Sequence, residues 1–337
     1  MDRLAEKPRR LRSPTFRLVC SYLFDWVLCI VLILLFFLLD RVEPFHRQFS
    51  VENPAIMFPY SAKDTIPIWA LVVIAVVFPV VVILVVGLGV RRSPYDFHNG
   101  ILGLLVSVML TTAFTQVIKV TVGKPRPDFL DRCQPMLNGV SITQDQPLHL
   151  WTYDVCTQTD LAVLKDGYRA FPSGHSSTAF AGLFYISLWL GGKMHIFDRR
   201  GYSLKGVILI VPILAALLIA ISRVQDYKHA AIDVTWGSII GIIFAVFAYH
   251  QYYPALTDAR SHVPHPPRDF SYLIKGSQGQ LREPGHLENI TGIQPNDNFI
   301  DETREHGSNS HDRSNNYRLS TVDVQDGTKP HDAARIV

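Results

Sequence analysis

The chain has 337 residues, of which 48% are hydrophobic, and its 32 basic and 29 acidic side chains leave a formal net charge of +3. So small a net charge gives no reason to expect a nucleic-acid partner, because binding to phosphate backbones requires a strongly basic surface. The length alone corresponds to about two domains. The distribution of apolar residues instead predicts one membrane domain followed by a polar tail.

Six long apolar runs succeed one another along the chain, each near the ~20 residues that a bilayer core requires. They cover about residues 18–39, 66–90, 99–118, 176–194, 204–222 and 232–252. The second run has no charged residue and the first has only Asp25, a pattern untypical of buried helices in soluble domains. We therefore expect an all-α integral membrane domain of six transmembrane helices over residues 18–253. Asp25, beside Trp26 near one end of its span, is expected to have a structural role at the interface.

The basic residues predict the orientation of the spans. Segment 1–17 carries six lysines and arginines, the second loop begins with Arg91-Arg92, and the fourth loop is also basic. By the positive-inside rule these segments face the cytoplasm. Both termini are then cytoplasmic, and the first, third and fifth loops lie on the lumenal or extracellular side. The organelle stays open among the vacuole, the endoplasmic reticulum or Golgi, and the plasma membrane.

Three polar stretches lie at the ends of spans on that same predicted side. They are KVTVGKPRP (Lys119 to Pro127), PSGH (Pro172 to His175) and SRVQDYKHAAID (Ser222 to Asp233). Together they supply cations, histidines and one carboxylate. A phosphate monoester is a dianion that must be held, neutralised and attacked opposite its leaving group. This inventory fits phosphoryl chemistry on a histidine.

The cations and a helix start are suited to holding phosphate. Lys119 and Arg126 are seven residues apart, two helical turns, and share one side if the third span continues that far. Arg223 closes the fifth span and can offer a bidentate fork to phosphate oxygens. Ser173 and Gly174 precede the fourth span, where free backbone amides point toward an anion.

The histidines are suited to the chemical steps. His229 and Asp233 are four residues apart at the start of the sixth span. This spacing stacks them on one helix face, where the carboxylate could fix the imidazole tautomer. Taken singly, each such residue is typical of an interfacial anchor or a helix cap. Their joint occurrence on one predicted face is what indicates an active site.

The combined pattern Lys-x6-Arg-Pro, Pro-Ser-Gly-His and Ser-Arg-x5-His-x3-Asp resembles the type 2 phosphatidic acid phosphatase superfamily, also called lipid phosphate phosphatases. The string GKPRPDFLDRCQP is most similar to the fungal diacylglycerol pyrophosphate and phosphatidate phosphatase branch. The resemblance covers roughly residues 18–253. It implies a helical-bundle core like that of the vanadium haloperoxidase and acid phosphatase superfamily.

The resemblance also implies roles for individual residues. His229 would be the nucleophile, Asp233 its orienting acid and His175 the proton donor to the leaving oxygen. The residues expected to bind phosphate are Lys119, Arg126, Ser173, Gly174 and Arg223. No metal and no cofactor is implied. Many relatives have a second histidine after the nucleophile, where this chain has Ala230, so the surroundings of the site are expected to differ.

The expected function is metal-independent hydrolysis of a lipid phosphate such as phosphatidate or diacylglycerol pyrophosphate, through a phosphohistidine on the extracytoplasmic side. Two alternatives stay open: a phosphotransferase that passes the phosphoryl group to an acceptor other than water, and a catalytically silent scaffold or transporter on the same fold. The six spans argue against a soluble vanadium-dependent peroxidase. The preferred lipid, the oligomeric state and any protein partner cannot be predicted.

The third loop, about residues 128–171, is long for a connection. It covers the site or contacts lipid head groups through residues such as Trp151, or it is a tolerated insertion; both interpretations stay open. Cys133 and Cys156 lie in it. We expect them to form a disulfide on an oxidising side of the membrane, provided that their Cα atoms approach within ~7 Å.

From about residue 254 the chain is poor in large apolar residues, so segment 254–337 is expected to be a disordered cytoplasmic tail. Its sequon at Asn289 should then carry no N-glycan. Phosphorylation could occur at serines such as Ser308, Ser314 or Ser320, and an inert tail is the alternative.

Overall fold

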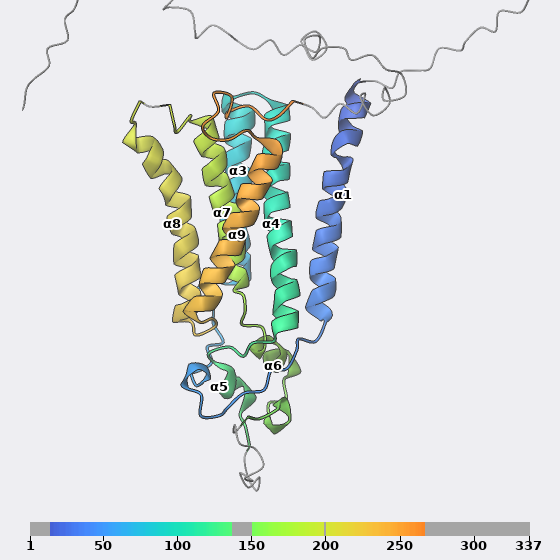
Figure 1. Ribbon diagram of the computed structural model, residues 1–337, viewed down its shortest axis with the longest axis vertical. Helices are drawn as coiled ribbons and strands as arrows, with labels where there is room; N and C mark the ends of the chain where they lie inside the picture. The colour runs from blue at the N-terminus through green and yellow to red at the C-terminus, as the bar shows by residue number, and fades with distance from the viewer. Residues whose placement is uncertain (1–13, 137–149, 199, 267–337) are drawn as a thin grey trace, which may run out of the picture. The chain divides into compact units, whose positions relative to one another are not determined.

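The computed structural model describes residues 14–136, 150–198 and 200–266 (Figure 1). Most of the basic N-terminus and most of the predicted tail lie outside these ranges. Asn289, Ser308, Ser314 and Ser320 therefore have no structural description. Between residues 14 and 266, the described parts of the chain form helices and no named strand.

Five long helical runs are apolar enough to cross a membrane within the described ranges. Four are single α-helices: α1 (Pro14–Arg41), α4 (Pro94–Val122), α8 (Ser203–Gln225) and α9 (Ala231–Tyr252). The fifth alternates between α-helical and π-helical turns, in the order α2 (Ile68–Val72), η2 (Val73–Val77), α3 (Phe78–Leu84) and η3 (Val85–Val90). The membrane-helix prediction is confirmed for these five runs.

The fourth predicted span is α7 (Gly174–Lys193), and it differs from the others in position and composition. It packs against α4, α8, α9 and η2. At Gly182 a Cβ atom would lie 1.8 Å from the Ala75 carbonyl oxygen, and at Gly241 of α9 it would lie 2.4 Å from the Ser177 carbonyl oxygen. A helix enclosed by close neighbours needs small residues more than a lipid-facing surface. That requirement explains why α7 is less apolar than the five runs above. The count of six spans stays a prediction.

The α1–α2, α4–α7 and α8–α9 connections gather at one end of the bundle, the lower end in Figure 1. The first and third loops meet through hydrogen bonds from Phe58 N to Pro127 O, 3.0 Å, and between Phe49 and Trp151. They share a small apolar core of Phe49, Ile56, Phe129, Cys133, Leu164 and Tyr168. This core is built partly on the short helices α5 (Phe129–Cys133) and α6 (Leu161–Gly167), with 3-10 turns at η1 (Pro54–Ile56) and η4 (Tyr153–Val155). The first loop and the described part of the third loop therefore pack into one unit, which we call the cap.

Cys133 and Cys156 form a disulfide, with 4.6 Å between their Cα atoms, which confirms the predicted pairing. Cys133 is the last residue of α5, and the Thr157 amide donates to its carbonyl oxygen at 3.0 Å. The bridge joins the two ends of a segment whose middle, residues 137–149, is outside the described chain.

Replacing both Cys133 and Cys156 by serine is expected to lower the free energy of unfolding of this cap by about 3 kcal/mol, the chain-entropy value for a loop of some two dozen residues. The change is measured by denaturant unfolding of the purified protein in detergent, with the susceptibility of the cap to proteolysis as the signal of unfolding. Cys29→Ala is the control, since Cys29 is a buried free cysteine in α1. Equal midpoints for the double variant and the native chain would contradict the expectation.

The chain continues to pack beyond residue 253, where the membrane domain was predicted to end. The Lys193 ammonium donates to the His262 carbonyl oxygen at 2.7 Å, and the His265 amide donates to the Tyr252 carbonyl oxygen at 2.9 Å. Segment 254–266 thus covers the end of the bundle opposite the cap. Tyr252 also donates to Asp25 at 3.0 Å, which fits the structural role expected for this acid.

Candidate active site

The third span delivers Lys119 and Arg126 in a different way from the one expected. Helix α4 ends at Val122, and Gly123 follows in the left-handed region with φ +56°. A Cβ atom at Gly123 would lie 1.6 Å from the Phe45 carbonyl oxygen, so only glycine fits this turn. Lys119 therefore lies in the last helical turn, whereas Arg126 follows in an irregular segment. The condition for one shared helix face, a third span that continues to Arg126, is therefore not met.

Arg126 is held by the third loop. Its amide donates to the Gly167 carbonyl oxygen at 2.9 Å, and its Nη2 donates to Asp166 Oδ1 at 2.6 Å. Asp166 accepts a second bond, 3.0 Å, from Arg132 Nη1. The Arg126 Nε–H is buried and has no hydrogen-bond partner within the described chain. Buried donors are rarely left unpaired in folded proteins, so this group is available to an incoming oxyanion.

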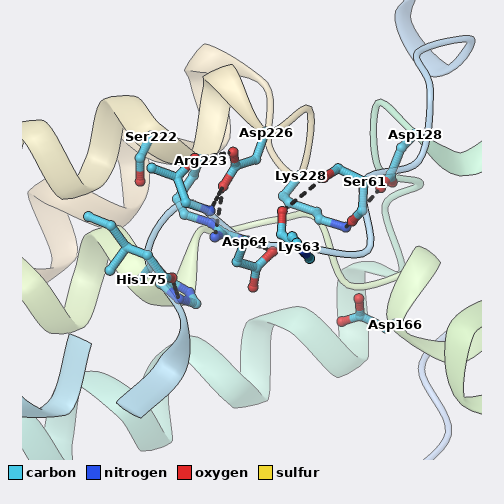
Figure 2. A network of polar contacts seen from close by, with 12 residues as sticks. Ser61, Lys63, Asp64, Asp128, Asp166, His175, Ser222, Arg223, Asp226 and Lys228 are labelled. Carbon is cyan, nitrogen blue, oxygen red and sulfur yellow. Dashed lines mark hydrogen bonds and ion pairs between the residues drawn. The ribbon is translucent and has the colours of Figure 1, made fainter. Parts of the chain in front are cut away.

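Arg223, in the last turn of α8, lies between two carboxylates (Figure 2). Its Nη1 is 3.4 Å from Asp226 Oδ2, and its Nη2 is 3.3 Å from Asp64 Oδ1. Asp226 is fixed in turn by the amide and hydroxyl of Thr65, at 2.9 and 2.6 Å. The Arg223 Nε–H is also buried without a partner among the described residues.

His229 precedes α9 and is fixed by the backbone. Its amide donates to the Arg223 carbonyl oxygen at 3.2 Å, and its Nδ1 lies 2.6 Å from the Ala170 carbonyl oxygen. A carbonyl oxygen can only accept, so Nδ1 carries the proton and Nε2 keeps its lone pair. Burial, together with the charges of Arg126, Lys119 and Arg223, holds the pKa of His229 well below its usual value. The imidazole is therefore neutral and suited to nucleophilic attack.

Asp233 makes different contacts from the ones expected. Because α9 begins at Ala231, His229 and Asp233 do not share a helix face as the spacing suggested. The fully buried Asp233 carboxylate accepts from the Ala230 amide at 3.0 Å and pairs with Lys124 Nζ at 2.6 Å. It therefore caps the N-terminus of α9 and fixes the backbone next to His229. The Ala170 carbonyl oxygen orients the imidazole.

The start of α7 supplies two further groups. The Ser173 hydroxyl caps the helix by accepting from the Ser176 amide, and the Ser173 amide donates to the Asp233 carbonyl oxygen at 2.9 Å. That amide is consequently occupied, contrary to the expectation that it is free for an anion. At Gly174 a Cβ atom would lie 3.2 Å from Lys119 Nζ, so glycine lets this ammonium approach the helix start. His175 Nε2 is 3.1 Å from the Ile66 carbonyl oxygen.

Sequence reasoning missed two contributions to the site. Lys124 lies within the first motif, but nothing in that string distinguished it from a surface lysine. The first loop supplies Asp64, Thr65 and Ile66 to Arg223, Asp226 and His175, across more than 100 residues of chain. No local pattern marks such partners. In the ranges that the structure describes, His, Cys, Asp and Glu side chains form no group of three that could hold a metal ion.

Comparison with known proteins adds independent findings. Residues 100–256 match the family model described as the PAP2 superfamily. Lipid phosphate phosphatase 2 of Arabidopsis thaliana is 42% identical over 282 residues, which is 83% of this chain and 93% of that protein. Diacylglycerol pyrophosphate phosphatase 1 of Saccharomyces cerevisiae is 39% identical over 263 residues, 77% of this chain and 86% of that protein. No solved structure matches significantly.

Proposed function

The chain belongs to the PAP2 superfamily, and we propose that it is a membrane-bound hydrolase that removes a phosphate group from lipids through a phosphohistidine on His229. The observation that carries the proposal is the 2.6 Å contact between His229 Nδ1 and the Ala170 carbonyl oxygen. This contact leaves the Nε2 lone pair free in a buried site rich in cations. Relatives that are named for lipid phosphate and diacylglycerol pyrophosphate hydrolysis support lipid phosphates as the substrate class.

In the first step, Nε2 of His229 forms a bond to phosphorus while the bond from phosphorus to the lipid oxygen breaks. The leaving oxygen takes a proton from His175 in its protonated form. The contact between His175 Nε2 and the Ile66 carbonyl oxygen fixes the ring for this transfer. The products are a phosphohistidine and a lipid alcohol, or phosphatidate when the substrate is a lipid pyrophosphate.

In the second step, water attacks the phosphohistidine and gives its proton to His175. The bond between Nε2 and phosphorus breaks, inorganic phosphate leaves, and both histidines return to their starting forms. Through both steps Lys119, Arg126 and Arg223 neutralise the charge on the transferring group. The unpartnered Nε–H groups of the two arginines are the donors that we assign to its oxygens. We propose that Ser173 acts through its cap on α7 and Gly174 through the space that it leaves for Lys119.

We place this chemistry on the lumenal or extracellular side of the membrane. Support comes from the basic loops, which the positive-inside rule puts in the cytoplasm, and from the disulfide in the cap, which forms in oxidising compartments. Membrane lipids are the proposed partners; no nucleic acid is expected.

Purified protein in detergent micelles should release phosphate from at least one of phosphatidate, lysophosphatidate, diacylglycerol pyrophosphate and a long-chain-base phosphate. Activity should survive excess EDTA, because the cations that neutralise phosphate are side chains. Orthovanadate should inhibit, since it adopts the five-coordinate geometry of the transferring group. Loss of activity on chelation, restored by magnesium, would contradict the mechanism. Phosphorylation of an added lipid alcohol in place of phosphate release would identify a phosphotransferase.

A further inference from the structure

Each proposed phosphate-binding arginine is paired with a carboxylate from a neighbouring loop: Arg126 with Asp166, and Arg223 with Asp64. The arginine side chains are 9% and 2% exposed, whereas the carboxylates are 47% and 29% exposed. An aspartate presents two anionic oxygens to a guanidinium, as a phosphate does. The carboxylates therefore contact Nη2 of each arginine, a position that a phosphate bound through both Nε and Nη2 would need.

The two carboxylates differ in how firmly they are held. Asp166 bonds to Arg132 as well as to Arg126, so it keeps a cationic partner if Arg126 turns to a phosphate. The ion pair of Asp64 within the described chain is with Arg223 alone, and its 3.3 Å distance is long for a charged hydrogen bond. Arg223 for its part keeps Asp226, which Thr65 fixes through two bonds. Removing Asp64 from Arg223 would thus leave the arginine oriented.

Asp64 also has space to move. It lines an open hollow of about 490 Å³ with Ala62, Lys63, Pro67, Ile68 and Trp69. Lys63 is the adjacent residue in the chain, and Figure 2 shows it near Asp64. Ile68 and Trp69, at the start of α2, are 69% and 71% exposed, so apolar surface leads from this hollow toward the membrane-spanning part of α2. The hollow therefore adjoins the Asp64 side chain that pairs with Arg223, and its other lining residues include the exposed apolar side chains at the start of α2.

We propose that Asp64 is a displaceable counter-ion that substrate phosphate replaces on Arg223, so that its carboxylate weakens the binding of every oxyanion to this arginine. This inference rests on the proposed function in that it assigns the arginine to phosphate. Displacement exchanges one anion for another on the same guanidinium. The Asp64 carboxylate neutralises Arg223 until a substrate phosphate replaces it, and the exchange selects for ligands with more negative charge than a single carboxylate.

The experiment compares the native chain with Asp64→Asn. Binding of orthovanadate is measured directly, by calorimetry or by the shift in Tm of the detergent-solubilised protein. Asp64→Asn should lower the vanadate Kd by roughly three- to tenfold, in line with partly exposed ion pairs. Its KM for a short-chain phosphatidate should fall, because Asp64 competes with the substrate phosphate for Arg223. Asp64→Glu, which restores the charge, should return the Kd toward the native value.

Asp198→Asn is the matched control, because Asp198, in the loop between α7 and α8, pairs with Lys205 of α8 outside the site. It should leave the vanadate Kd unchanged. An unchanged or raised Kd in Asp64→Asn, or a large fall in kcat, would show that Asp64 anchors the first loop and would overturn the proposal. Vanadate binding needs no turnover. Failure of the native chain to hydrolyse any lipid phosphate would therefore count against the proposed function and leave the Asp64 comparison interpretable.

Discussion

His229→Ala is expected to lower kcat by roughly four orders of magnitude or more, the scale seen when a covalent nucleophile is removed. Alanine has no Nε2, so no phosphohistidine can form. Incubation of the native enzyme with a radiolabelled lipid phosphate, followed by rapid alkaline quenching, should trap label on the protein. The variant should trap none. His175→Ala should still be labelled by a substrate whose leaving group needs no proton, because attack by His229 remains possible.

The control for this experiment is His250→Ala. His250 lies near the end of α9 far from His229 and is exposed. This variant should keep native kcat, and both variants should reach the membrane in similar amounts, because removal of the buried His229 side chain leaves the Ala230 cap and α9 in place. Substantial activity in His229→Ala would mean that another residue is the nucleophile.

Arg223→Ala should lower kcat/KM by roughly 10³-fold, and Arg223→Lys by about 10- to 100-fold. Alanine removes the charge that faces the transferring phosphoryl group and leaves Asp226 without its arginine. Lysine restores the charge but not the planar fork or the Nε–H. Steady-state kinetics on one lipid phosphate in mixed micelles, over a range of substrate concentrations, gives both values.

Arg91→Ala serves as the comparison, since Arg91 also pairs with a buried carboxylate, Asp96, but at the opposite end of the bundle. Both alanine variants break an ion pair and should lower Tm, whereas only Arg223→Ala should reduce kcat/KM strongly. Similar kinetics in the two variants would assign Arg223 a structural role. Orthovanadate binding in Arg223→Ala gives a second readout, because loss of the Nε–H should raise the vanadate Kd.

The parts of the fold and site that sequence could predict are those that depend on local signals. Length and composition alone predict six apolar runs, because a bilayer demands them, and five of these are membrane-capable helices in the described ranges. The cysteine pair was predicted from its shared loop, and the bridge is present. Geometry inferred from helical spacing was less reliable. A face shared by Lys119 and Arg126 required α4 to reach Arg126, and a face shared by His229 and Asp233 required α9 to include His229. Gly123 instead ends α4, and Ala230 caps α9.

The parts that could not be predicted depend on contacts between distant segments. Asp64 meets Arg223 across 159 residues, and Lys124 meets Asp233 across 109. In the sequence, the first loop is an ordinary polar connection between two spans. Only the packing of the cap, with Phe58 hydrogen bonded to Pro127 and Lys228 bonded to the Ser61 carbonyl oxygen, brings Asp64 to the site. Such partners are properties of the assembled loops.

The contact between His229 and Ala170 has a consequence for genetics. In many enzymes a histidine is oriented by a carboxylate that a single codon change removes, with a tautomer error as the result. Here the acceptor is a main-chain oxygen, and every amino acid at position 170 possesses one. Missense changes at that codon can perturb the tautomer only by moving the backbone. A saturation screen should therefore show tolerance at residue 170 that is graded by side-chain size, since the Ala170 side chain is fully buried.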